Sequence, residues 1–254
     1  GGPVMKDKFW YFGSFRSQHI EFMYPTLPDR PFLTTITDYT AKLTYQLPRN
    51  NKVISYVMWG LKKQPYRHDS FLLGNTAFQE GEKSTWNQWN PGWVWKLEWN
   101  KSFGSSVFAE ARIGHWFDDW HQKSRSDEPR KEDLTLNRVF GGNRDWLRHQ
   151  NRPQSTGAVT YYNDRWGGSH NLKFGYELQM DQSRVIWGKA YPGNVVQILR
   201  NGAPSEVYFL ASDLDSDSRL YWYSGYATDT FTRNRVSINA GLRYELQLPF
   251  YPLN

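Results

Sequence analysis

The chain of 254 residues is rich in aromatic side chains, at 17% with 13 Trp, yet polar on average, with a mean hydropathy of −0.76. No stretch approaches the roughly 18 consecutive apolar residues of a membrane-spanning helix, so helical insertion is excluded. The absence of Cys excludes disulfides and cysteine-based zinc or iron–sulfur sites. The net charge of +6 comes from scattered Lys and Arg residues that form no stripe, so no nucleic-acid partner is expected.

The regular parts of the chain alternate apolar and polar residues with a period of two, which predicts an all-β protein. In the clearest strand, Leu172, Phe174 and Tyr176 oppose Lys173 and Gly175. About nine strands are expected, each near the 9–11 residues that cross a bilayer at a tilt. In chain order they cover residues 8–18, 38–47, 53–62, 93–100, 107–114, 157–162, 172–180, 220–229 and 236–245.

The predicted connections alternate between short and long. Tight turns rich in Pro, Asn, Gly and Ser occupy residues 48–51, 102–105, 165–169 and 232–234. The long connections cover residues 18–37, 64–91, 118–154 and 183–217. This alternation is typical of an antiparallel transmembrane β-barrel with short periplasmic turns and long extracellular loops.

A sheet with an apolar face in lipid must close on itself, because lipid cannot hydrogen-bond a free strand edge. Bacterial single-chain barrels have even strand numbers, so nine strands indicate a part of a larger wall. The residues Gly1 to Val4 show no features of a signal peptide, and we interpret the chain as an internal fragment.

Several segments resemble the Oar-like branch of TonB-dependent receptors, in which a plug lies inside a barrel of the 22-stranded type. The resemblance rests on the order and spacing of four segments: 1–14, 42–47 with the turn after it, 170–177 and 241–245. It implies that residues 1–254 are a partial TonB-dependent receptor β-barrel domain, without the plug and the N-terminal domains. More barrel strands are expected after Asn254.

The resemblance also implies a location and a role. The chain is expected in the bacterial outer membrane, as barrel wall and extracellular loops for uptake or binding of an unidentified large solute. Its expected partners are outer-membrane lipid and an unknown extracellular ligand, with TonB and the plug contacted only through the rest of the parent protein. Neither catalysis nor a cofactor is expected.

Ten charged residues fall on the polar side of the predicted strands, which faces the barrel lumen in this interpretation. They could guide a solute or contact a plug, but the favoured interpretation is a solvated face whose charges balance. These residues are Arg16, Lys42, Lys96, Glu98, Glu110, Arg112, Lys173, Glu177, Arg243 and Glu245.

A weak metal candidate lies in the last long connection, where Asp213, Asp215 and Asp217 alternate as at the start of a calcium loop. The match ends there, because Ser218 and Ser224 stand where an EF-hand has Gly and Glu. A solvated acidic turn is therefore favoured, and calcium bridging in an extracellular loop stays an alternative.

The alternative function is a small self-contained outer-membrane barrel enzyme, a protease or lipase, with rim residues His115, Asp118, Asp119 and His121. One His and one Asp could form an acid–base pair, but no nucleophile with a recognisable context accompanies them. The favoured interpretation is a membrane-interface belt, and it extends to Trp93, Trp95, Trp99, Trp116 and Tyr45. A soluble, aromatic-rich β protein that binds sugar is a third possibility.

Overall fold

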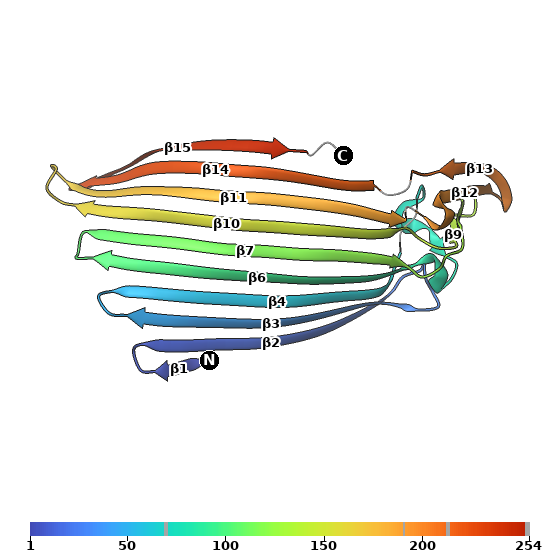
Figure 1. Cartoon of the computed structure of the whole chain (residues 1–254), viewed down its shortest axis with the longest axis horizontal. Coiled ribbons are helices and arrows are strands. Elements are labelled where there is room, and N and C mark those ends of the chain that lie inside the picture. The colour runs from blue at the N-terminus through green and yellow to red at the C-terminus, as the bar shows by residue number, and fades with distance from the viewer. Residues whose placement is uncertain (69–70, 190, 212–213, 252–254) are drawn as a thin grey trace.

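Strands make up most of the chain. The computed structural model describes residues 1–68, 71–189, 191–211 and 214–251. Ten strands form one antiparallel sheet in the order β1-β2-β3-β4-β6-β7-β10-β11-β14-β15, so each strand pairs with the next one of this set along the chain (Figure 1). The predicted all-β, antiparallel architecture is confirmed.

All nine predicted strands lie in this sheet, and a short tenth strand, β1, precedes them. Their bounds are β1 (Gly2–Met5), β2 (Phe9–Met23), β3 (Pro31–Leu47), β4 (Asn51–Arg67), β6 (Trp86–Phe103), β7 (Val107–Ser124), β10 (Asp145–Asn163), β11 (Ser169–Lys189), β14 (Leu214–Arg233) and β15 (Val236–Phe250).

The strands are longer than predicted, because they continue where the apolar alternation stops. The nine long strands contain 15 to 21 residues each. The strand β10 begins at Asp145, well before the predicted start at Gly157, since its first half is polar on both sides and gives no period-two signal. The predicted long connection 18–37 shrinks accordingly to residues 24–30.

The turn end of the sheet agrees with the prediction. The turns between β3 and β4 and between β14 and β15 lie at one end of the molecule, away from the longer connections (Figure 1). Arg49, Asn50 and Asn234 adopt positive φ angles of 59°, 56° and 54°. Tight hairpins need such left-handed residues, and Asn adopts this conformation more readily than most.

The opposite end carries a second sheet of five short strands, in the order β13-β12-β8-β9-β5 (Figure 1). The strands are β5 (Phe78–Gln79), β8 (Arg130–Asp133), β9 (Arg138–Phe140), β12 (Val195–Arg200) and β13 (Ala203–Phe209). They come from three different connections between long strands, which had been predicted as loops. We call this sheet, with the segments that join it to the long strands, the cap.

The cap holds most of the fully buried side chains of the described chain. Val196 and Ile198 on β12 pack with Tyr191, and Phe71 closes the cluster. Beneath them, Arg130 and Glu132 form a fully buried ion pair at 3.3 Å. Both oxygens of the Glu132 carboxylate also accept backbone N–H bonds, from Phe71 and Leu72. These hydrogen bonds offset the cost of burying the two charges, so a small core tolerates the ion pair.

Asp133 ties three segments of the cap together. Its carboxylate accepts backbone N–H bonds from Thr135 and Leu136 at 3.0 Å each, and from Asn201 at 3.2 Å and Gly202 at 2.6 Å. Burial alone would raise the pKa of this carboxyl, but the four donors outweigh it and hold the pKa below its usual value. The Asn201–Gly202 pair, with φ angles of 56° and 80°, turns β12 into β13 at this point.

Three short 3₁₀ turns complete the structure: Gly74–Thr76, Glu82–Ser84 and Pro192–Asn194. In the part of the chain that the structure describes, no helix has the length and apolar character to cross a membrane.

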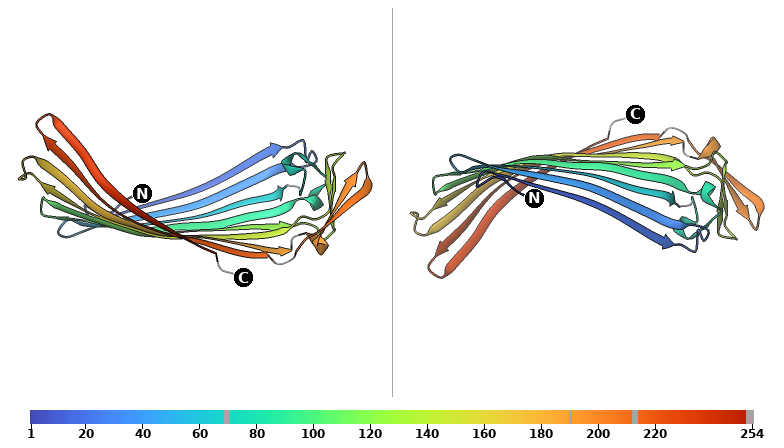
Figure 2. Two further views of the ribbon diagram at one scale, coloured as in Figure 1. Left: turned by 90° about the horizontal axis from the view of Figure 1, so that it is seen from above. Right: turned by 90° about the horizontal axis from the view of Figure 1, so that it is seen from below.

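The large sheet is twisted and curved, so its first and last strands cross at a wide angle when seen along the sheet (Figure 2). Within the described residues, β1 pairs only with β2 and β15 only with β14, so the sheet has two free edges. Neither face is covered by a second layer along the length of the strands (Figure 2).

The core of the cap predicts a local cost for truncation. Ile198 is 0% exposed, so Ile198→Ala should lower the free energy of opening of the cap by about 2–4 kcal/mol through lost burial and a cavity. Native-state hydrogen exchange of the β12 and β13 amides measures this. The control Val207→Ala, on a side chain 52% exposed, should change it by less than about 0.5 kcal/mol. Equal effects of the two changes would contradict the packing described above.

The Asp133 contacts predict a pH dependence. Because the folded pKa is lowered, the stabilisation is complete above the unfolded carboxyl pKa of about 3.9 and is lost as the pH falls through the folded value. Asp133→Asn should therefore loosen the cap at pH 7, and the difference from the parent chain should vanish in strong acid. Hydrogen exchange of the Asn201 and Gly202 amides between pH 2 and 7 tests this, and a difference independent of pH would refute it.

Candidate functional site

The register of the long sheet separates its side chains onto two faces. Directly opposed residues of antiparallel strands point to the same side of a sheet, so one row of partners defines a face. The row through Leu178 reads Tyr11, Leu43, Ser55, Leu97, Ile113, Ser155, Leu178, Tyr223 and Leu246. We call this side the apolar face and the opposite side the polar face.

The ten charged residues predicted to share a side do so. The register places all of them on the polar face, from Arg16 on β2 to Arg243 and Glu245 on β15. On the same strands, the apolar face presents large side chains that remain exposed, such as Leu97 at 41% and Leu178 at 42%. Apolar groups in this number, uncovered by protein, mark a surface that contacts something other than water.

The charges of the polar face are paired across several strands. Glu98 accepts contacts from Lys96 Nζ at 3.0 Å and Arg112 Nε at 3.3 Å. Glu110 binds Arg112 Nη2 at 2.7 Å and Lys173 Nζ at 2.9 Å. The last contact spans β10, whose Ala158 lies between β7 and β11 at this level and leaves room for the lysine side chain.

A second pairing joins the last strands. Arg243 Nη2 on β15 lies 3.1 Å from Glu177 Oε2 on β11 and also binds Glu245. Glu177 accepts a further hydrogen bond from Gln154 Nε2 on β10 at 2.9 Å. These charges therefore balance one another along a hydrated surface, and no single one of them stands apart as a reactive group.

The four rim residues of the alternative enzyme do not form one cluster, which corrects the prediction. His115, Asp119 and His121 lie on the apolar face, while Asp118 lies on the polar face, because adjacent strand residues point to opposite sides. Asp119 binds His149 and lies 3.8 Å from His121. His121 stacks on Trp89 with ring centroids 4.8 Å apart.

An acid–base pair is therefore present in Asp119 and His149, but no hydroxyl nucleophile accompanies it. In the described part of the chain, the imidazoles of His115, His121 and His149 make their polar contacts with Asn151 or Asp119. A triad needs a nucleophile within hydrogen-bond reach of the base. The geometry gives no support to hydrolysis at this rim.

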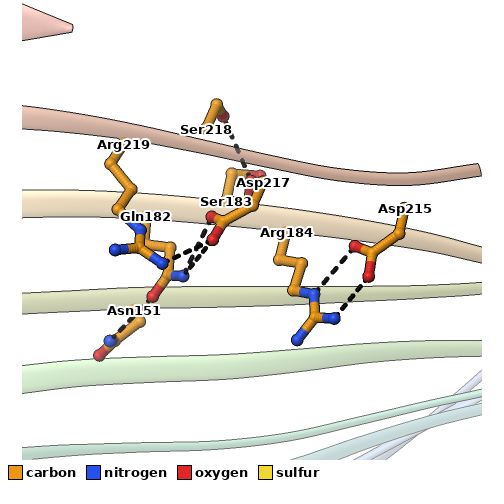
Figure 3. Close-up of polar contacts among 8 residues, drawn as sticks. All are labelled: Asn151, Gln182, Ser183, Arg184, Asp215, Asp217, Ser218 and Arg219. Carbon is orange, nitrogen blue, oxygen red and sulfur yellow. Dashed lines mark hydrogen bonds and ion pairs between the residues drawn. The ribbon is translucent and has the colours of Figure 1, made fainter. Parts of the chain in front are cut away.

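Of the metal candidate, Asp213 lies outside the described residues, and the other two carboxylates bind side chains of β11 and of their own strand β14 (Figure 3). Asp215 accepts hydrogen bonds from Arg184 Nε at 2.9 Å and Nη2 at 2.5 Å. Asp217 accepts from Gln182 Nε2 at 3.0 Å and Arg219 Nη2 at 2.7 Å. Among the described residues, no group of three or more His, Asp or Glu is arranged to hold a metal ion.

These contacts form a polar patch that the sequence analysis missed. It lies on the apolar face where β7, β10, β11 and β14 approach the cap, and Figure 3 shows its part from Asn151 to Arg219. Asn151 Nδ2 donates to Gln182 Oε1 at 3.4 Å, which links the patch across β10 and β11. The patch ends the apolar surface of these strands on the cap side, so their apolar part lies toward the tight turns.

Trp116 also departs from its predicted position. It was grouped with Trp93, Trp95, Trp99 and Tyr45 as part of an interface belt, but the register places it on the polar face, below the guanidinium of Arg152 at 5.5 Å. The other four lie on the apolar face, as predicted. Counting in twos from Arg112 would have placed Trp116 correctly, since the two share their parity.

The comparisons with known proteins concern the fold. No protein-family model matches the sequence, and no curated protein matches it either. Among solved structures, the chain is similar to the outer membrane transporter YddB from Escherichia coli, with a TM-score of 0.70, 12% identity and 96% of this chain covered. It is also similar to FpvA of P. aeruginosa, solved with bound pyoverdines, with a TM-score of 0.66, 10% identity and 98% coverage.

The chain spans about a third of each of these proteins, 32% of YddB and 34% of FpvA. At such low identity the likeness concerns the fold alone, and the Oar-like branch is not resolved by it. The ten-stranded sheet thus has the fold of about a third of these two proteins.

Proposed function

We propose that the chain forms part of the barrel wall and of the outer loops of a TonB-dependent receptor in the bacterial outer membrane. The observation that carries this proposal is the division of one sheet into two exposed faces, one apolar and one charged. Lipid covers the apolar face and water fills the space along the polar face. The fold shared with YddB and FpvA supports the same arrangement.

The orientation follows from the two ends of the sheet. Short turns at one end and long connections at the other are the arrangement of outer-membrane barrels, whose long loops lie outside the cell. The cap therefore lies on the extracellular side. Its folded core holds the outer loops in one arrangement, as a binding surface for a large solute needs.

The free edges of the sheet fit a segment of a larger barrel. Unpaired backbone N–H and C=O groups are too costly in hydrocarbon for β1 and β15 to remain edges there. Residues 1–254 are accordingly a partial TonB-dependent receptor β-barrel domain, and further strands of the parent protein complete the wall. Contacts with TonB and with a plug belong to those other parts.

The finer assignment to the Oar-like branch rests on the order of the sequence segments named above, from Gly1 to Glu245. The chemical nature of the solute does not follow from the neighbours, since the pyoverdines bound by FpvA are a property of that protein. Catalysis is not proposed, because Asp118 points away from the histidines of the rim.

A pair of adjacent substitutions tests the two faces. Leu178→Lys places a charge in the lipid, and it should lower the free energy of unfolding from phosphocholine vesicles by about 2–4 kcal/mol near the bilayer midplane. Gln179→Lys, one residue further on the polar face, should change that free energy by less than about 1 kcal/mol. Urea titration of vesicle-bound protein, followed by Trp fluorescence, provides both values.

Two results would contradict the proposed location of the chain. If Leu178→Lys and Gln179→Lys cost the same, or if the purified chain stays monomeric in water without detergent or lipid, the apolar face is not covered by hydrocarbon. The proposed location and the proposed role would then both be wrong.

A further inference from the structure

Two adjacent glycines hollow the polar face in the half of the sheet nearer the cap. Across β3, β4, β6, β7 and β10, the register aligns Asp38, Gly60, Gly92, Asp118 and Gln150. The two glycines are direct partners on neighbouring strands, so the middle of the row has no side chains. The floor of a trough is therefore made of backbone.

Two carboxylates lie over this floor. A Cβ atom added to Gly60 would lie 2.8 Å from Asp38 Oδ1, and one added to Gly92 would lie 3.1 Å from Asp118 Oδ1. Both glycines have ordinary extended backbone, so no positive φ angle accounts for them. What they provide is space, and the two aspartates border that space from opposite sides.

Aromatic, apolar and polar side chains form different sides of the trough. Trp116 and Trp120 flank Asp118 on the polar face of β7, and the strand repeat separates them by roughly 13 Å. Met58 on β4 lines the side away from the cap. The trough is open to one side, and its volume is about 380 Å³.

The wall nearest the cap is held rigidly by a row of buried amides. Gln64 Nε2 donates to Thr34 Oγ1, and Gln122 Nε2 donates to Gln88 Oε1, both at 2.9 Å. Gln88 Nε2 in turn donates to Asn90 Oδ1 at 2.8 Å. Because Gln88 fixes the carbonyl of Asn90, the amide N–H groups of Asn90 stay available for another partner.

Several polar atoms at the trough have no hydrogen-bond partner among the described residues, although Arg148 Nη2 donates to Gln150 Oε1 at 2.6 Å. Neither Asp118 nor Lys62 makes a hydrogen bond or an ion pair there. The indole Nε1 of Trp120 and the guanidinium Nε of Arg148, which packs 5.3 Å from the Trp120 ring, are also unpaired. Polar groups left unpaired in a concave site indicate a ligand that supplies the missing bonds.

The charges around the trough select the class of ligand. Asp38 and Asp118 disfavour an anion, while Lys62 and Arg148 disfavour a cation. A hydroxyl group satisfies both kinds of residue, because it donates to a carboxylate and accepts from an ammonium or an indole N–H. A sugar ring also presents an apolar C–H face, which packs against the indole rings of Trp116 and Trp120 where the guanidinium groups over them leave them open.

We propose that this trough binds a ring of a neutral oligosaccharide. The proposal rests on the proposed function in one respect, that the polar face lines a water-filled lumen open to the outside. The trough then lies in the half of the wall nearer the cap, on the path of a solute that has passed the outer loops.

Ligand titration of the full chain in detergent micelles tests the proposal. The probes are maltohexaose, cellohexaose and mannohexaose, followed by Trp fluorescence and by saturation-transfer NMR. At least one of them should bind, and Trp120→Leu and Asp118→Asn should each weaken that binding by about tenfold or more, equivalent to about 1.4 kcal/mol. Gly92→Leu, which fills the floor, should abolish it.

Matched controls lie on the same face outside the trough. Trp222→Leu on β14 removes an indole without touching the trough, and Thr44→Leu on β3 adds an apolar side chain lower on the same side. Both should leave the affinity within twofold of the parent chain. Hydrogen exchange of the cap amides verifies that every variant is folded.

Three outcomes would overturn the proposal. They are no binding by any of the three hexasaccharides, tighter binding of an oligogalacturonate or a chitosan oligosaccharide than of the neutral sugars, and equal loss in Trp120→Leu and Trp222→Leu. Vesicle insertion of the same chain is measured separately. Normal insertion without sugar binding would refute the trough and leave the barrel assignment intact.

Discussion

Backbone pairing between long neighbouring strands is the constraint on which the rest of this structure depends. A strand in hydrocarbon has no water to satisfy its N–H and C=O groups, so every strand must pair along its length. Pairing fixes the register, and the register fixes which side chains share a face. A slip of one residue in β11 alone would carry Lys173 and Glu177 into the lipid and bring Leu178 into the lumen. The separation of charged and apolar side chains onto two faces is thus a consequence of backbone hydrogen bonding. The cost of a shift in register reinforces it.

The part of the sheet that approaches the cap depends on different interactions. There the apolar face gives way to polar ties such as Arg184 with Asp215 and Gln182 with Asp217 (Figure 3). Cross-strand pairs of this kind each contribute roughly 0.2–1 kcal/mol, so they support the pairing without determining it. The cap adds what these ties lack, a buried core around Ile198 and the carboxylate links of Asp133. The outer ends of the long strands are joined through it.

The sequence predicted the fold better than it predicted the site, for a physical reason. One apolar face and one polar face impose a period-two pattern on segments such as 172–180, and all nine segments of this kind are strands of the large sheet. Toward the cap that pattern stops, so the first half of β10 and the whole of β8 give no period-two signal in the sequence. The Asn201–Gly202 turn was a local signal for the β12–β13 hairpin that could have been used.

The predicted site residues were placed correctly only where they lie in these alternating segments. The ten charges lie in the alternating segments, so their common face could be predicted from parity alone. Asp118 and Trp116 were misplaced because residues near one another in sequence were treated as near one another in space, although a strand sends neighbours to opposite sides. The alignment of Gly60 with Gly92 could not be predicted, since it depends on the pairing of two strands that a connection of eighteen residues separates (68–85).

That alignment bears on how the polar face is used. Glycine within a strand weakens it, because it contributes no side chain to pack and loses more conformational freedom than other residues, by roughly 0.5–1 kcal/mol relative to Ala. Ion pairs suffice to keep a lumenal surface hydrated, as Glu98 and Glu110 show, and they need no glycine. Two glycines side by side, bordered by aspartates and by a fixed row of buried amides, weaken the wall without adding to its charge balance. The loss is explained if the space itself has a use, and contact with a solute is the use that a lumenal recess beneath outer loops permits.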